Sequence, residues 1–206
     1  MDINECILVY GDLVMARPKS EDKRNAILAA ATRVFAQRGL AAAPTSEISK
    51  QASLAEGTLF TYFNTKDDLI NALYRELKLE LADALMSSFP RRKGIRSRLQ
   101  HVWNSYVNWG IANPEQRKVL AQLQVSDILT KESRDAGSAP FKEIQEMTVE
   151  AIQQRILRKE LPQELVSRAL GAFADSTMDL IATNPKMADE YRRGGFEMFW
   201  AAIARA

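Results

Sequence analysis

Apolar residues recur along most of this 206-residue chain at the three- and four-residue spacing of amphipathic helices. Runs that alternate β-branched and polar residues, which would indicate strands, are missing from the sequence. In the segment that follows Ser20, acids in the first turn precede Ile27, Val34 and Phe35, and the pattern closes on Arg38 and Gly39. We therefore predict an all-α fold whose first helix begins at Ser20 as a cap.

Two very short helical stretches come next, Ser46 to Gln51 and Glu56 to Tyr62, and Thr65 then caps a long helix that runs to about Ser87. Two short helices joined by a tight turn have the geometry of a helix-turn-helix, whose second helix can enter a major groove. Such short helices rarely persist alone. The residues predicted to pack them against Ile27, Val34 and Phe35 are Ile48, Ala52, Leu54, Leu59 and Phe63.

A Pro, Gly and basic cluster at 89–94, FPRRKG, separates this small unit from the rest of the chain. Beyond it the periodicity predicts further helices at about 97–112, 114–130, 140–159, 162–182 and 185–204, with a loop at 131–139. Pro114, Pro140, Pro162 and Pro185 each stand where a first-turn proline is tolerated.

The composition excludes several classes of protein but does not identify one. A hydrophobic fraction of 46% and 26% charged residues exclude a disordered chain, and the net charge of +2 does not by itself indicate nucleic-acid binding. Cys6 and His101 are the single cysteine and histidine, so we expect no internal disulfide and no metal site, and a reducing compartment. The sequence contains no run of about 18 apolar residues, so we expect no membrane span.

An enzyme is one competing class. The sequence has no phosphate-binding glycine loop, nucleophile elbow or metal-ligand cluster, and we expect neither catalytic residues nor a cofactor. His101 stands alone beside apolar neighbours and is interpreted as a surface or packed residue.

The most specific motif runs from Thr45 to Leu69, TSEISKQASLAEGTLFTYFNTKDDL. With the preceding FAQRGL it resembles, over roughly 23–74, the DNA-binding region of TetR-family transcriptional regulators. The resemblance implies a three-helix helix-turn-helix DNA-binding domain at 15–70 and a larger helical ligand-binding and dimerisation domain at 71–206, in a bacterial cytoplasm. Residues 1–14 look unlike the family, and we expect them to be an irregular extension or an alternative start.

Candidate DNA contacts follow from this motif. Gly57 allows close approach of the recognition helix, Thr58 and Thr61 offer hydroxyls, and Tyr62 offers a phenol to a phosphate. Lys66 and Thr45 begin helices, where free backbone N–H groups attract anions. An arm before the first helix reaches a minor groove or phosphates. The predicted DNA-binding residues are Arg17, Lys19, Thr45, Glu56, Gly57, Thr58, Thr61, Tyr62 and Lys66.

Two positions depart from the family pattern. Ser53 stands in the turn where a glycine is usual, and Ala55 stands where a serine or threonine usually caps the recognition helix. The lost cap costs about 1 kcal/mol. Glu56 either offsets part of this cost through the helix dipole or accepts a hydrogen bond from cytosine, and we favour the structural role.

Aromatic residues of the larger domain suggest an effector site lined by Tyr74, Trp103, Tyr106 and Phe173. Flat aromatics suit bulky planar or cationic ligands, although the same spacing also fits a plain core. The segments MARPKSED, AEGTLF, TKDDLINALY, WNSYVNWG, STMD and GFEMFW resemble RamR-type regulators, which implies a repressor of efflux or stress genes that hydrophobic or cationic compounds release.

The last two predicted helices offer more apolar surface than a small domain hides, and Gly171, Ala172, Gly194 and Gly195 permit close helix approach. The family pairs these helices in a homodimer, which implies a palindromic operator in double-stranded DNA. The remaining alternative is a protein with this fold that binds a small molecule and has lost specific DNA binding.

Overall fold

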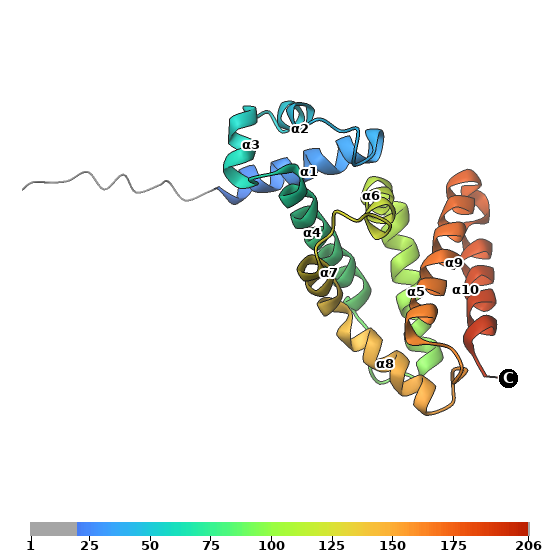
Figure 1. Cartoon of the computed structure of the whole chain (residues 1–206). Helices are drawn as coiled ribbons and strands as arrows, with labels where there is room; N and C mark the ends of the chain where they lie inside the picture. Colours follow the sequence, from blue (N-terminus) through green and yellow to red (C-terminus); the bar gives the residue numbers. More distant parts are fainter. Residues whose placement is uncertain (1–19, 206) are drawn as a thin grey trace, which may run out of the picture.

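The computed structural model describes residues 20–205 and shows an all-helical chain in two parts, with a small three-helix unit beside a larger helical domain (Figure 1). The expectations for residues 1–14, Arg17 and Lys19 lie outside the described residues. The elements are α1 (Glu21–Arg38), α2 (Thr45–Gln51), α3 (Glu56–Tyr62), α4 (Lys66–Met86), α5 (Ile95–Ala112), α6 (Pro114–Gln124), α7 (Lys131–Ser138), η1 (Ala139–Phe141), α8 (Lys142–Gln153), α9 (Gln163–Thr183), η2 (Pro185–Met187) and α10 (Ala188–Ile203).

The small unit packs as the sequence predicts. Ile27, Val34 and Phe35 of α1 are fully buried, and they share one hydrophobic core with Ile48 of α2 and Leu59 of α3. Phe63 is also buried there, and Ala52 and Leu54 pack partly buried against the same core. The predicted packing of the two short helices on α1 is therefore confirmed.

The turn between α2 and α3 places Ser53 in the left-handed region, with φ 57°. The Ser53 N–H donates to the carbonyl of Lys50, and the Leu54 N–H donates to the carbonyl of Ser49 at 3.0 Å. These two bonds form a Schellman motif, in which glycine usually holds the left-handed position. The turn therefore requires a backbone conformation that costs serine about 1–2 kcal/mol.

Helix α4 connects the small unit to the larger domain (Figure 1). It begins in a capping box: the Thr65 hydroxyl accepts from the Asp68 N–H at 3.0 Å, and the Asp68 carboxylate accepts from the Thr65 N–H at 3.1 Å. The predicted cap at Thr65 and the predicted length of this helix are confirmed. The first turn of α4 thus belongs to the small unit, and its last turns belong to the larger domain.

The expected loop at 131–139 is wrong, because Lys131–Ser138 form α7. Thr130 caps this helix, with its side chain accepting from the Ser133 N–H. Helix α7 packs on α4 so closely that a Cβ at Gly137 would overlap the ring of Tyr74. The segment is polar and contains a glycine, so it lacks the apolar periodicity that predicts a helix. Its helical state depends on its packing against α4.

Two further expectations differ at helix ends. The helix expected at 140–159 is η1 followed by α8, which ends at Gln153, and the helix expected to reach residue 130 ends at Gln124. Ser20 occupies the N-cap of α1 but makes no side-chain capping bond. Its backbone N–H instead donates to the Tyr62 hydroxyl at 2.9 Å, which ties the start of α1 to the end of α3.

We predict that Ser53→Gly raises the free energy of unfolding by about 0.5–1 kcal/mol. Glycine removes the left-handed strain, and its larger entropy loss on folding offsets part of that gain. Urea denaturation measures the change. Ala29→Gly, at an exposed helical position in α1, is the matched control and costs about 1 kcal/mol. Destabilisation by both glycines would show that the turn does not strain Ser53.

Candidate functional site

The N-termini of α2 and α3 lie next to each other and are joined by side chains. The Thr45 hydroxyl in the first turn of α2 donates to the carboxylate of Glu56, in the first turn of α3, at 2.8 Å. Ala55, the N-cap of α3, makes no side-chain bond to its helix. Glu56 thus joins the first turns of the two helices, and its predicted effect on the dipole of α3 stays a prediction.

Lys66 stands at the start of α4 and reaches back to the loop before α2. Its Nζ donates to the carbonyl of Ala41 at 3.1 Å and lies 5.9 Å from the centre of the Phe35 ring. A lysine ammonium has three donors, so two remain after this bond. Lys66, Thr45 and Phe60 line a surface pocket of about 520 Å³ with the loop residues 41–44.

The outer face of α3 is exposed and small at its centre. Gly57 faces open space, since a Cβ there would meet no other part of the structure within 4 Å. Thr61 is exposed and its hydroxyl donates to the carbonyl of Gly57 at 3.0 Å, which leaves the oxygen as an acceptor. Thr58 is half-buried on the same short helix. The predicted DNA contacts of Gly57, Thr58 and Thr61 stay predictions.

Phe60 is a residue of this surface that the sequence reasoning did not select. Its side chain is 41% exposed on α3 and lines the same pocket as Lys66. An exposed aromatic on a recognition helix suits apolar contact with a thymine methyl group. The sequence could have indicated that Phe60 is exposed, because the neighbouring Leu59 already occupies the buried position of this turn.

The side chain of Tyr62 is held within the protein and does not project freely. Its hydroxyl accepts the hydrogen bond from the Ser20 N–H, and the residue makes further interactions within the protein. Tyr62 thus fixes the start of α1 on the end of α3. The predicted phosphate contact of Tyr62 stays a prediction.

The four aromatic residues predicted to line an effector site do not all lie in one cluster. Trp103 is fully buried, stacks on Phe199 with centroids 6.0 Å apart, and donates its Nε1–H to the carbonyl of Arg192 at 2.9 Å. Phe173 also contacts Phe199, with the two rings tilted and their centroids 6.3 Å apart. Trp103 and Phe173 therefore belong to one aromatic cluster between α5, α9 and α10.

Tyr106 and Tyr74 make their contacts with other residues than those of this cluster. Tyr106 stacks on Trp109 at 6.4 Å, and its pKa is raised, first by burial and then by the nearby Asp175. Tyr74 is half-buried against Gly137 of α7, and burial raises its pKa as well. Both phenols are therefore neutral at physiological pH, and a common pocket for all four residues stays a prediction.

A polar network joins α4 to the start of α7, and sequence reasoning missed it. Buried Asn71 donates to the carbonyl of Ile128 at 3.1 Å and accepts from the Thr130 N–H at 2.9 Å. One turn further along α4, Arg75 donates to the Ser133 hydroxyl at 2.6 Å. We call these residues the α4–α7 joint. It fixes α7 to the first half of α4, next to the small unit.

Comparison with known proteins agrees with this geometry. Residues 27–73 match the family model of bacterial regulatory proteins of the tetR family. The chain is 39% identical over 70 residues, 34% of its length and 37% of the relative, to the HTH-type transcriptional repressor Rv3405c of Mycobacterium tuberculosis. It is 25% identical over 99 residues, 48% of its length and 50% of the relative, to the fatty acid metabolism regulator protein of Bacillus subtilis.

In fold the likeness extends much further. A crystal structure from Shewanella sp. PV-4, assigned to the tetR family of transcription regulators, superposes with a TM-score of 0.81 and 26% identity, covering 89% of this chain and 99% of that one. In sequence, the chain spans about half or less of the length of these two curated relatives. The chain is thus similar in fold over most of its length, and in sequence over residues 27–73, to transcription regulators of the tetR family.

The relatives are transcription regulators and not enzymes. Within residues 20–205, no helix has the length and apolarity that crossing a membrane requires.

Lys78 of α4 packs against η1, with its Nζ 4.1 Å from the centre of the Phe141 ring. Burial lowers the pKa of Lys78 from 10.5 to about 8. Between these values the unfolded chain holds a proton that the folded protein has released, so stability rises with pH through this window. Below it, both states are protonated and the cost of burying the charge is complete.

We therefore expect Lys78→Met to raise the free energy of unfolding at pH 7 by about 2 kcal/mol, because the cation–π contact offsets only part of the burial cost. Urea denaturation at pH 7 and pH 10 measures both effects, and the gain shrinks at pH 10. Lys118→Met, at an exposed position of α6, is the control and leaves stability unchanged. Equal pH dependence in both variants would contradict the assignment.

Proposed function

We propose that the protein is a dimeric, ligand-responsive regulator that binds double-stranded DNA through α3 and represses transcription. The observation that carries this proposal is the surface around the joined N-termini of α2 and α3. There Thr45, Lys66 and Phe60 line one pocket beside the exposed face of α3. The first turn of α2 and Lys66 at the start of α4 suit a backbone phosphate, and the adjacent face of α3 suits base edges.

The proposed domains are a DNA-binding domain at 15–70 and a ligand-binding and dimerisation domain at 71–206. The boundary falls in the first turns of α4. The site of action of such a regulator is the bacterial cytoplasm. The alternative, a protein of this fold without specific DNA binding, is favoured only by the uncapped Ala55 and the strained Ser53.

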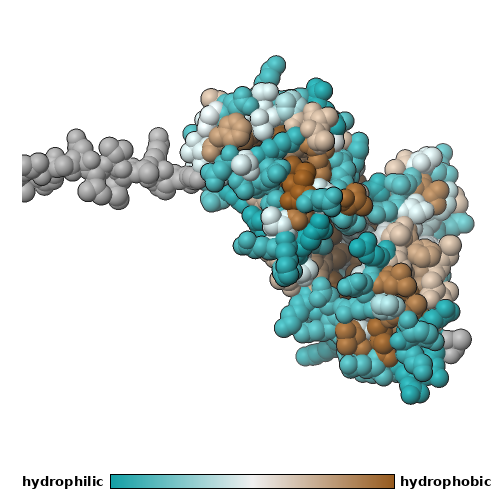
Figure 2. Space-filling model, viewed as in Figure 1, coloured by the Kyte–Doolittle hydropathy of each residue, from teal (hydrophilic) through white to brown (hydrophobic). Residues whose placement is uncertain are grey.

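The outer face of α9 and α10 supports the dimer. Leu165, Leu180 and Met198 are 50%, 49% and 65% exposed, and Figure 2 shows apolar residues among the polar surface on this side of the larger domain. Gly195 is used within the chain, since a Cβ there would lie 2.8 Å from the Trp103 ring. Gly171 and Gly194 instead face open space.

Glycines and exposed apolar residues together make a surface that a second copy can approach closely. A groove of about 530 Å³ runs between the two helices and is lined by Gly194, Leu180 and Met198 among others. An isologous dimer through this face presents two copies of α3 to one duplex, so the operator is palindromic.

The α4–α7 joint supports a route for regulation. An effector that moves α7 or the helices behind it acts on the first half of α4 through Asn71 and Arg75. Because α4 begins at Lys66, a shift of α4 changes the spacing of the paired α3 helices. The effector weakens DNA binding only as far as it prefers the other arrangement.

The proposed effector is a small hydrophobic or cationic compound, as the resemblance to RamR-type regulators implies, and the regulated genes are efflux or stress genes. The relative named as a fatty acid metabolism regulator adds fatty acyl compounds as a second effector class. Both classes belong in one test. Fluorescence anisotropy with the DNA flanking the protein's own gene, repeated with planar cations, bile acids and fatty acyl-CoAs, identifies the class that releases the DNA.

We predict that Lys66→Gln weakens operator binding severalfold and reduces the slope of affinity against salt by about one ion, because one phosphate contact is lost. Anisotropy titrations at several salt concentrations measure both quantities. Lys118→Gln, which removes an exposed charge from α6 far along the chain from α3, is the control and changes neither. Unchanged affinity of Lys66→Gln would remove Lys66 from the interface, and absence of operator binding in the wild type would favour the alternative.

We predict that Met198→Lys raises the dimer dissociation constant about tenfold or more, because a twofold interface buries the new charge twice. Sedimentation equilibrium measures this constant. Val125→Lys is the control, since Val125 is 86% exposed at the end of α6 and outside the groove. A wild-type protein that is monomeric, or a dimer that both variants leave intact, would contradict the proposed interface.

A further inference from the structure

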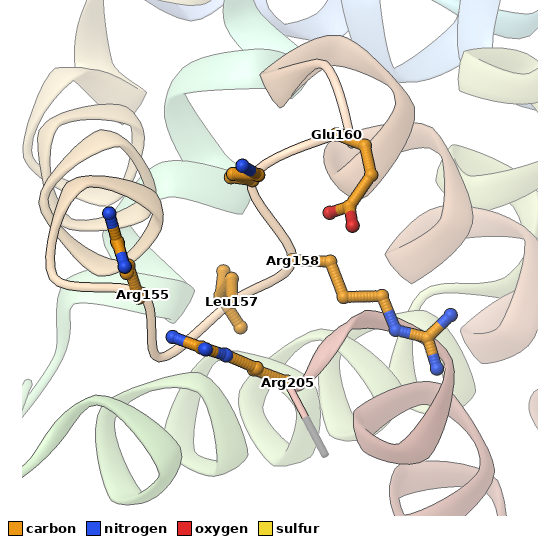
Figure 3. Close-up of a pocket in the computed structure, with 6 residues that line it drawn as sticks. Arg155, Leu157, Arg158, Glu160 and Arg205 are labelled. Carbon is orange, nitrogen blue, oxygen red and sulfur yellow. The ribbon is translucent and has the colours of Figure 1, made fainter.

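A pocket at the far end of the larger domain is lined almost entirely by charged side chains (Figure 3). It has a volume of about 410 Å³ and is lined by Arg155, Leu157, Arg158, Lys159, Glu160 and Arg205. We call it the basic pocket. Four of these residues are cationic and one is acidic, which leaves an excess of three positive charges around one cavity.

Backbone contacts between distant segments build the basic pocket. Arg155 lies two residues after the end of α8, in the left-handed region with φ 57°, and the chain then turns toward the end of α10. The Arg158 N–H donates to the carbonyl of Ile203 at 2.9 Å, and the Arg205 N–H donates to the carbonyl of Ile156 at 3.0 Å. An antiparallel bridge pairs Leu157 with Ala204 between these bonds. The fold therefore brings Arg205 beside 155–160.

One of the four cations has a structural task. Arg158 donates from Nε to the carbonyl of Ala204 at 3.2 Å and from a terminal nitrogen to that of Ala201 at 3.5 Å. It thus satisfies free carbonyls at the C-terminus of α10. Among residues 20–205, Arg155, Lys159 and Arg205 form no ion pair with an acid. Their charges repel one another, and an anion between them relieves that repulsion.

The location separates the basic pocket from the DNA-binding surface. In Figure 1 the C-terminus and the connection from α8 to α9 lie at the end of the larger domain opposite α1, α2 and α3. A duplex on α3 is therefore not in reach of these residues. Any ligand of the basic pocket is therefore separate from that duplex.

We propose that the basic pocket binds a small molecule that carries two or more phosphate groups. Guanidinium groups match phosphate oxygens in a bidentate geometry, and the volume falls in the range of about 300–1,000 Å³ that small-molecule sites have. Leu157, the one apolar lining residue, is fully buried, so the walls offer charge and not an apolar slot. Recognition is electrostatic, and the ligand stabilises the contact between the α8–α9 connection and the end of α10.

The test is isothermal titration calorimetry of the full chain, without DNA and at low ionic strength, with sodium triphosphate and with ATP as probes. Any affinity tag is placed at the N-terminus, because a C-terminal tag would lie beside Arg205. The variant combines Arg155→Gln, Lys159→Gln and Arg205→Gln and retains Arg158, which caps α10. The matched control combines Arg92→Gln, Lys93→Gln and Lys118→Gln, three exposed cations outside the pocket.

We expect one triphosphate per chain, a rise in the thermal midpoint on binding, and a dissociation constant about tenfold or more weaker in the pocket variant than in the control. Equal binding of triphosphate and ATP assigns recognition to the phosphates alone, and tighter binding of ATP adds a contact to the nucleoside. Absence of binding, or equal loss in both variants, would overturn the proposal. So would binding to phosphatidylglycerol vesicles without binding of triphosphate, because the surface would then contact a membrane. Operator binding is measured separately, so its failure does not affect this test.

Discussion

The small unit depends on the burial of Ile48 and Leu59 against α1, because α2 and α3 have only seven residues each. A helix of two turns does not persist in water, since its nucleation cost is not recovered by so few backbone bonds. The packing on Val34 and Phe35 supplies the missing stability. The orientation of α3, and with it the exposed face around Gly57, follows from this apolar contact and not from the propensity of α3 itself.

Helix α4 carries that orientation into the rest of the molecule. Its capping box and Lys66 belong to the small unit, while Asn71 and Arg75 bind the start of α7 a few residues later. Two sets of polar contacts on one helix thus connect α7 to the small unit, as the proposed route of regulation requires. Because buried polar groups cost free energy when their partners are removed, this joint has few intermediate arrangements. That property suits a regulator with two states.

The candidate DNA site was predictable from the sequence in its residues but not in all their tasks. The spacing of Thr45, Gly57 and Lys66 predicted the surface, and the missing side-chain cap at Ala55 was predicted correctly. That Ser53 adopts the left-handed conformation became visible only in the structure. The bonds of Glu56 to Thr45 and of Tyr62 to Ser20 required coordinates. A residue type shows what a side chain can bind, and only its neighbours decide what it does bind.

The sequence by itself determined the all-helical class, the positions of α1 to α4 and the apolar residues that bury them, because periodicity and caps act within a few residues of each other. The tertiary structure alone decided that 131–138 is a helix, that Trp103 and Phe173 share Phe199, and that Arg205 joins the cations of 155–160. These features arise from contacts between segments far apart in the chain. Contacts of that kind are selected by how the helices pack, and they leave no local pattern in the sequence.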